Sequence, residues 1–109
     1  MNDLVTIGLP SKGRLKDKAV SFFDKNGLKI LQSKKERNYF GSIENKPNIK
    51  IIFLHAKEII QRLGDGTLDI GVSGLDLLNE SDKNLRDKIG IKRKLDFGNA
   101  SLVIAVPDD

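Results

Sequence analysis

The chain has 109 residues, enough for one domain with a modest core, and a net charge of +4 from 19 Lys and Arg against 15 Asp and Glu. The positive charges are scattered and the chain has no Trp and one Tyr, a pattern that favours an acidic small molecule over nucleic acid. The lack of cysteine excludes disulfides, thiolate catalysis and zinc–cysteine sites. No signal peptide or membrane-spanning run is visible, so we expect a cytoplasmic protein without a membrane partner.

The first predicted elements are a strand over 5–9 and a helix over 13–26. The strand stops at Pro10, and the helix follows the short turn Ser11-Lys12-Gly13 and carries Arg14. Free N–H groups at a helix start, the positive end of the helix dipole and two cationic side chains make this turn a candidate anion site. The alternative is a solvated helix start. The turn lacks the Gly-x4-Gly-Lys-Ser/Thr pattern of a P-loop.

The remaining chain alternates short apolar runs with amphipathic stretches. A second helix is expected over 56–64, a third opening at Ser73 with a capping box to Asp76, and a charged helix and loop over 80–90. Strands are expected over 28–31, 38–43, 49–54, 68–72, 91–95 and 100–106, with a turn at 47–48. This order predicts an α/β fold, with a mostly parallel sheet and helices on both faces.

Ligands of such sheets bind beyond the carboxyl ends of the strands, where segments 10–14, 55–57 and 72–76 should meet. His55 could offer a polar contact there. Ser73 either caps the third helix or, with Gly74, faces a ribose or phosphate. Arg37 could reach across the cleft, or lie exposed, and Asp69 reads as a structural acid. We identify no catalytic side chain and no metal-ligand spacing.

Four motifs in register resemble one enzyme family. Pro10-Ser11-Lys12-Gly13-Arg14-Leu15 resembles the Lys-Gly-Arg signature of ATP phosphoribosyltransferase, the first enzyme of histidine biosynthesis. Arg37-Asn38-Tyr39 is similar to its next strand. Segment 68–78 resembles its second signature, and Leu95-Asp96-Phe97-Gly98 with Ala105-Val106-Pro107 its third.

The resemblance implies one lobe of a type II periplasmic-binding-protein-like fold. It also implies a glycosyltransferase that joins ATP and phosphoribosyl pyrophosphate (PRPP) to give N1-phosphoribosyl-ATP and pyrophosphate, with Mg²⁺ on the diphosphate. On this basis Lys12, Arg14 and Arg37 bind ATP, with Gly13 in the same turn. Ser73, Gly74 and Asp76 line the cleft, and His55 lies where the family commonly has an Arg.

We expect residues 1–109 to form a single lobe with the second lobe absent, since nothing here matches the family's acidic, Gly-Thr-rich PRPP loop. The isolated chain is therefore expected to be inactive. Expected partners are ATP, PRPP, further copies of the chain and, as in the short-form enzymes, a regulatory subunit related to histidyl-tRNA synthetase. The alternatives are a non-catalytic nucleotide-binding or self-associating module and a small flavodoxin-like binder. Oligomeric state, histidine feedback and the phosphate that each cation meets stay open.

Overall fold

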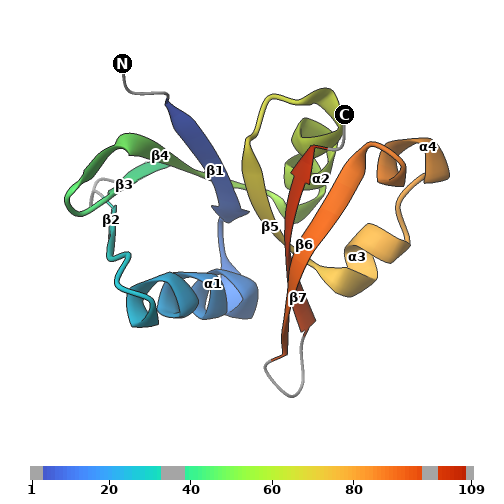
Figure 1. The fold of residues 1–109 in the computed structure, drawn as a ribbon. Coiled ribbons are helices and arrows are strands. Elements are labelled where there is room, and N and C mark those ends of the chain that lie inside the picture. The colour runs from blue at the N-terminus through green and yellow to red at the C-terminus, as the bar shows by residue number, and fades with distance from the viewer. Residues whose placement is uncertain (1–3, 33–38, 97–100, 108–109) are drawn as a thin grey trace.

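A single seven-stranded sheet organises the chain in the computed structural model, which describes residues 4–32, 39–96 and 101–107 (Figure 1). The sheet order is β2-β3-β4-β1-β5-β7-β6. The elements in chain order are β1 (Val5–Pro10), α1 (Gly13–Lys25), β2 (Ile30–Gln32), β3 (Phe40–Ile43), β4 (Lys46–Leu54), α2 (Ala56–Asp65), β5 (Ile70–Gly74), α3 (Leu75–Asn79), α4 (Lys83–Arg86), β6 (Ile89–Asp96) and β7 (Ser101–Pro107).

The α/β fold agrees with the sequence prediction, but the sheet is more mixed than strand–helix alternation indicates. Its centre is parallel, with β1 between β4 and β5. The β2-β3-β4 side and the β5-β7-β6 side are joined by antiparallel pairs. One reason is connectivity: a two-residue turn links β3 to β4, and a hairpin can join only antiparallel strands. On the other side β7 lies between β5 and β6 and is antiparallel to both.

Helices cover both faces of the sheet, as expected. On one face α1 buries Ala19 and Phe23 in a cluster with side chains of β1, β4, β5 and β7. On the other face α2 buries Ile59, Ile60 and Leu63 in a second cluster, which also takes in α3 and α4. In Figure 1 α1 lies apart from the group formed by α2, α3 and α4. In each helix the buried side chains recur with the 3.6-residue period, so they lie on one face of the helix.

The close approach of α2 to β5 depends on a glycine. A Cβ built on Gly71 would lie 2.8 Å from Leu63 Cδ1 and 2.9 Å from Ile59 Cγ2, distances that real Cβ atoms do not show. The helix therefore packs directly against bare backbone at this point. That packing fixes the position of α2 relative to the parallel strands, and so the position of its first residue at their carboxyl ends.

Two local expectations are wrong. The turn expected at 47–48 lies at Glu44–Asn45, and Pro47 is inside β4. Asn45 takes a left-handed conformation (φ 66), which Asn tolerates better than most residues. Ser73 does not cap the third helix: it is the fourth residue of β5, where it pairs with Val103, and Gly74 is the N-cap of α3 without a side-chain hydrogen bond.

Asp69 has the structural role that the sequence predicts. Its Oδ2 accepts a hydrogen bond from the Thr6 N–H at 2.8 Å, and its own N–H donates to the Thr6 carbonyl at 3.0 Å. The pair joins the beginnings of β1 and β5, at the edge of the sheet opposite to the candidate site. None of the helices in the described part of the chain is long and apolar enough to span a membrane.

Candidate functional site at the carboxyl ends of the parallel strands

The three segments expected to meet do share one edge of the sheet. The strands β4, β1 and β5 are adjacent and parallel, and they end at Leu54, Pro10 and Gly74. The Ser11 N–H donates to the Leu54 carbonyl at 3.0 Å, which joins the β1–α1 turn to the end of β4. A Cβ on Gly74 would lie 3.7 Å from Leu15 Cδ1, so the start of α1 also lies against the end of β5.

The beginning of α1 carries positive charge with no protein group to balance it among the described residues. Lys12 is the N-cap in an extended conformation (φ −163), its side chain makes no capping hydrogen bond, and the first turn holds no acidic residue. Lys12 and Arg14 are both exposed. Cations at a helix start oppose the helix dipole and weaken the helix, whereas an anion bound there would use the free N–H groups and both side chains.

Gly13 is required by the backbone at this turn. Its φ is +81, a conformation that side-chain-bearing residues rarely adopt, and a Cβ built on it would meet no atom within 4 Å. The glycine is therefore not needed to make room. It allows the left-handed backbone conformation that leads from Lys12 into the first turn of α1.

A hollow of about 630 Å³ opens beside this turn, at the ends of β1 and β4. It contains two of the predicted site residues, Lys12 and His55. The remaining lining residues are Ser11, Tyr39, Phe40, Ile52, Phe53, Leu54 and Glu58. The hollow therefore combines a few polar side chains, Lys12, His55 and Glu58, with apolar and aromatic ones, which is the usual composition of a small-molecule site.

His55 has a defined structural role at the rim of this hollow. It is the N-cap of α2, and its Nδ1 accepts a hydrogen bond from the Lys57 N–H at 3.2 Å. In the neutral imidazole the proton is then on Nε2, which makes that exposed nitrogen a donor. Glu58, in the first turn of α2, accepts a hydrogen bond from Arg62 Nε at 2.9 Å. The start of α2 therefore has a side-chain cap and an acidic residue, whereas the start of α1 has neither.

The other predicted contacts at the end of β5 do not line this hollow. The Ser73 side chain is 1% exposed, and its Oγ donates to the Gly74 carbonyl at 3.4 Å, so it is turned into the protein. Asp76 is exposed in the first turn of α3. The structure thus brings Lys12 and His55 together in the hollow. Gly13 and Arg14 follow Lys12 in the β1–α1 turn, and the β5–α3 turn lies at the same edge; neither lines the hollow.

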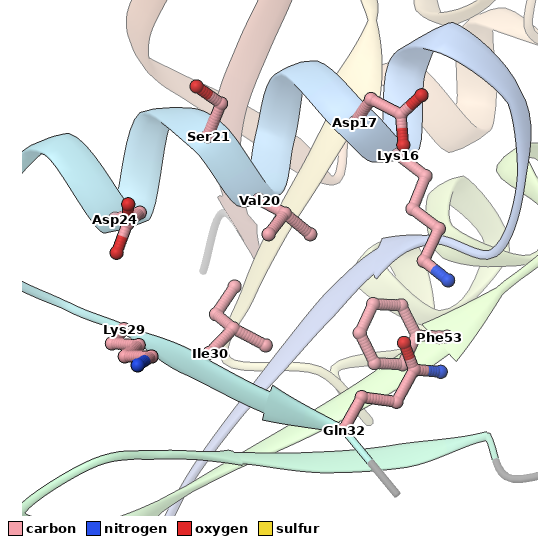
Figure 2. Close-up of a pocket in the computed structure, with 9 residues that line it drawn as sticks. All are labelled: Lys16, Asp17, Val20, Ser21, Asp24, Lys29, Ile30, Gln32 and Phe53. Atoms are coloured by element: carbon pink, nitrogen blue, oxygen red, sulfur yellow. The ribbon is translucent and has the colours of Figure 1, made fainter. Parts of the chain in front are cut away.

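A second hollow, of about 460 Å³, lies on the other side of Phe53 (Figure 2). It separates α1 from β2, with Val20 and Ile30 facing each other across it and Lys16 reaching toward the Phe53 ring. The Lys16 ammonium lies 5.0 Å from the centre of that ring. Phe53 lines both hollows and so forms the partition between them.

Arg37 lies outside the described residues, as do Phe97 and Gly98 of the third motif, and their predicted roles remain predictions. The structure also places Tyr39, Phe40 and Glu58 in the first hollow, and none of them is among the site residues predicted from the sequence. The aromatic pair Tyr39-Phe40 begins two residues after Arg37, but the sequence gives no sign that these side chains share a hollow with Lys12.

The comparisons place the chain in a known family. A model of the family described as "HisG: ATP phosphoribosyltransferase" matches residues 55–109, which is half of the chain. The chain belongs to the ATP phosphoribosyltransferase family. The match begins at His55 and includes the second motif, which contains β5, and the third, which includes the end of β7.

Two curated ATP phosphoribosyltransferases, from Brucella melitensis and Brucella ovis, are each 41% identical to this chain over 104 residues. The alignments cover 95% of this chain and so include the β1–α1 turn, but only 45% of either relative. The chain thus spans less than half the length of the ATP phosphoribosyltransferases that it matches.

The fold has a counterpart among solved structures. A chain of the ATP phosphoribosyltransferase HisG:HisZ complex from Thermotoga maritima has a similar fold, with a TM-score of 0.57 and 21% sequence identity. The superposition covers 85% of this chain and 41% of the Thermotoga maritima chain. This likeness supports an α/β lobe of the same architecture.

Proposed function

We propose that residues 1–109 form the ATP-binding lobe of an ATP phosphoribosyltransferase, which catalyses the first step of histidine biosynthesis. The observation that carries the proposal is the uncapped, cationic start of α1 at the edge shared by β4, β1 and β5. Membership of the family supports the proposed reaction, and the cationic turn supports the start of α1 as the proposed polyphosphate site.

In the proposed reaction adenine N1 attacks the anomeric carbon of PRPP. The N1–carbon bond forms, the bond from that carbon to the pyrophosphate oxygen breaks, and pyrophosphate leaves. The residues of this chain would hold ATP rather than perform a proton transfer. Arg14 would bind two phosphate oxygens with its planar guanidinium, Lys12 would act as a point charge, and the first N–H groups of α1 would complete the anion site. Such charge neutralisation and positioning lower the barrier.

The described part of the chain offers no all-protein cage for a Mg²⁺ ion. Among the described residues, no three His, Asp or Glu side chains come close enough together to hold a metal ion. We propose that Mg²⁺ arrives on the substrate phosphates, since Mg²⁺ keeps several waters and is commonly bound through one or two carboxylates plus phosphates.

We propose that the isolated chain binds ATP without turning it over, because the relatives that carry the family activity are more than twice as long. The wider setting is also part of the proposal: a cytoplasmic enzyme that assembles from several copies and a regulatory subunit. The solved Thermotoga maritima HisG:HisZ complex supports such a second subunit.

The test combines binding and turnover in the purified chain. Calorimetry should detect ATP binding, and mass spectrometry should find no phosphoribosyl-ATP after incubation with ATP, PRPP and Mg²⁺. Arg14→Ala should weaken ATP binding, whereas Arg86→Ala, which removes an equally exposed guanidinium from α4, should not. Product formation would contradict the proposal of a lobe that needs further protein. Equal ATP affinities of the two variants would contradict the phosphate site at α1.

A further inference from the structure

Two aromatic side chains are unusually open to solvent at the end of β4. Tyr39 is 54% exposed and Phe40 is 49% exposed, although both are large and partly or wholly apolar. Among the described residues the other exposed large apolar side chains, Leu4, Leu31 and Ile91, do not line the first hollow. Tyr39 and Phe40 do line it, together with Lys12 and His55. Aromatic surface gathered in a hollow beside cations indicates a ligand with an apolar ring and a negative charge.

The backbone that carries these rings is held in place. The Phe53 N–H donates to the Tyr39 carbonyl at 2.7 Å, which joins Tyr39 to β4. Phe40 is the first residue of β3, opposite Ile52. The two aromatic residues are therefore mounted on the sheet, and their rings project from a fixed frame.

The two rings differ in what already covers them. The Lys50 ammonium lies 4.7 Å from the centre of the Phe40 ring, so this ring has a cation against it. Tyr39 lines the same hollow and is 54% exposed overall. Of the two, Tyr39 offers the larger open surface to a flat ligand.

The second hollow cannot serve the same purpose. Its aromatic residue, Phe53, is 1% exposed and lies under the Lys16 ammonium. Figure 2 shows Lys16 extending from α1 toward this ring, so a planar ring entering between α1 and β2 would find no open aromatic face. The first hollow is thus the one that combines open aromatic surface with the cationic turn.

We propose that Tyr39 is the stacking platform for the purine ring of the bound nucleotide. This inference rests on the proposed ATP site. The start of β3 lies two strand positions from β1, about 10 Å across the sheet, so an extended nucleotide could place its base at Tyr39 and its phosphates at the start of α1. Stacking is tolerant of base identity. The exposed Nε2 donor of His55, on the same rim, is suited to a ring-nitrogen acceptor.

The chain contains its own probe for this contact, because Tyr39 is its one tyrosine and it has no Trp. Tyrosine fluorescence therefore reports on Tyr39 alone. After correction for absorption by adenine, ATP should change this fluorescence saturably. Inorganic triphosphate, which has no ring, should bind by calorimetry and leave the fluorescence unchanged.

Variants separate stacking from structure. Tyr39→Ala should weaken ATP binding by about fivefold or more, the usual cost of losing one base–aromatic stack, and leave the affinity for inorganic triphosphate unchanged. Tyr39→Phe keeps the ring and should retain the affinity for ATP. Leu31→Ala, which truncates an exposed apolar side chain outside the hollow (43% exposed), is the matched control and should leave both affinities unchanged.

Each result decides one of the two proposals. If Tyr39→Ala leaves ATP affinity unchanged, or weakens ATP and inorganic triphosphate alike, Tyr39 is not a stacking platform. Such a result leaves the phosphate site intact as long as inorganic triphosphate still binds and Arg14→Ala weakens it. If Arg14→Ala changes neither affinity, the phosphate site is refuted. A failure of ATP to bind at all would overturn both.

Discussion

Replacement of Gly13 by alanine probes the turn on which the proposed site depends. Gly13 has φ +81 and open space around its Cα, so the added methyl group meets no neighbour. The whole cost then comes from the backbone, where a left-handed conformation costs an L-residue about 1–2 kcal/mol. A loss of about 1 kcal/mol lowers the Tm of a domain of roughly this size by about 4 to 8 °C.

Gly66 provides a matched control for this substitution. It has φ +79, it also has no atom within 4 Å of a built Cβ, and it ends α2 at the opposite edge of the sheet. Gly13→Ala and Gly66→Ala should therefore destabilise the protein to a similar degree in urea or thermal unfolding. They should differ in ATP binding.

The two variants should differ in ATP binding because Gly13 lies in the proposed phosphate site and Gly66 does not. Gly13→Ala should weaken ATP binding about tenfold, the effect of losing one hydrogen bond to a charged group. Gly66→Ala should leave ATP binding unchanged when measured well below the Tm of either variant. The reasoning is refuted if Gly13→Ala is as stable as the parent chain, or if both variants bind ATP equally well.

Three further substitutions test separate parts of the account. Arg14→Ala should reduce both the affinity for ATP and the dependence of that affinity on salt concentration, whereas Arg86→Ala should change neither. An unchanged salt dependence in Arg14→Ala would argue against a phosphate contact. Gly71→Ala should cost about 1–3 kcal/mol in urea unfolding, because its Cβ would lie 2.8 Å from the nearest side-chain atom of α2; an unaltered midpoint would contradict that packing. Asp69→Ala should cost about 1 kcal/mol through loss of the 2.8 Å hydrogen bond from the Thr6 N–H, with ATP binding retained; weaker binding would place Asp69 in the site.

The parts of the fold that the sequence predicts well are those set by local pattern. The helices predicted over 13–26 and 56–64 are observed over Gly13–Lys25 and Ala56–Asp65, and Gly27 and Gly66, which follow them, both have positive φ. The position of His55 after a buried strand correctly predicts that it lies at the carboxyl end of β4. The Lys-Gly-Arg turn is likewise visible from composition and glycine placement alone.

The parts that the sequence misses depend on pairing between distant strands. Ser73 fits a capping box by its spacing to Asp76, but pairing with Val103 keeps it in β5. The direction of β7 cannot be read from its apolar run, and this strand makes that side of the sheet antiparallel. Tyr39 looks like an ordinary strand residue in sequence, and only the assembled sheet shows that it lines a hollow with Lys12.

The most direct test of the central claim is a titration of the ¹⁵N-labelled chain with ATP, followed through the backbone amide signals. The account predicts saturable shifts of the Gly13, Arg14 and Leu15 amides, which inorganic triphosphate should reproduce, and little change at Thr67 on the opposite edge of the sheet. If the signals of those three amides do not shift while ATP binds, or if the shifted signals belong to α3 and α4 instead, the start of α1 is not the phosphate site.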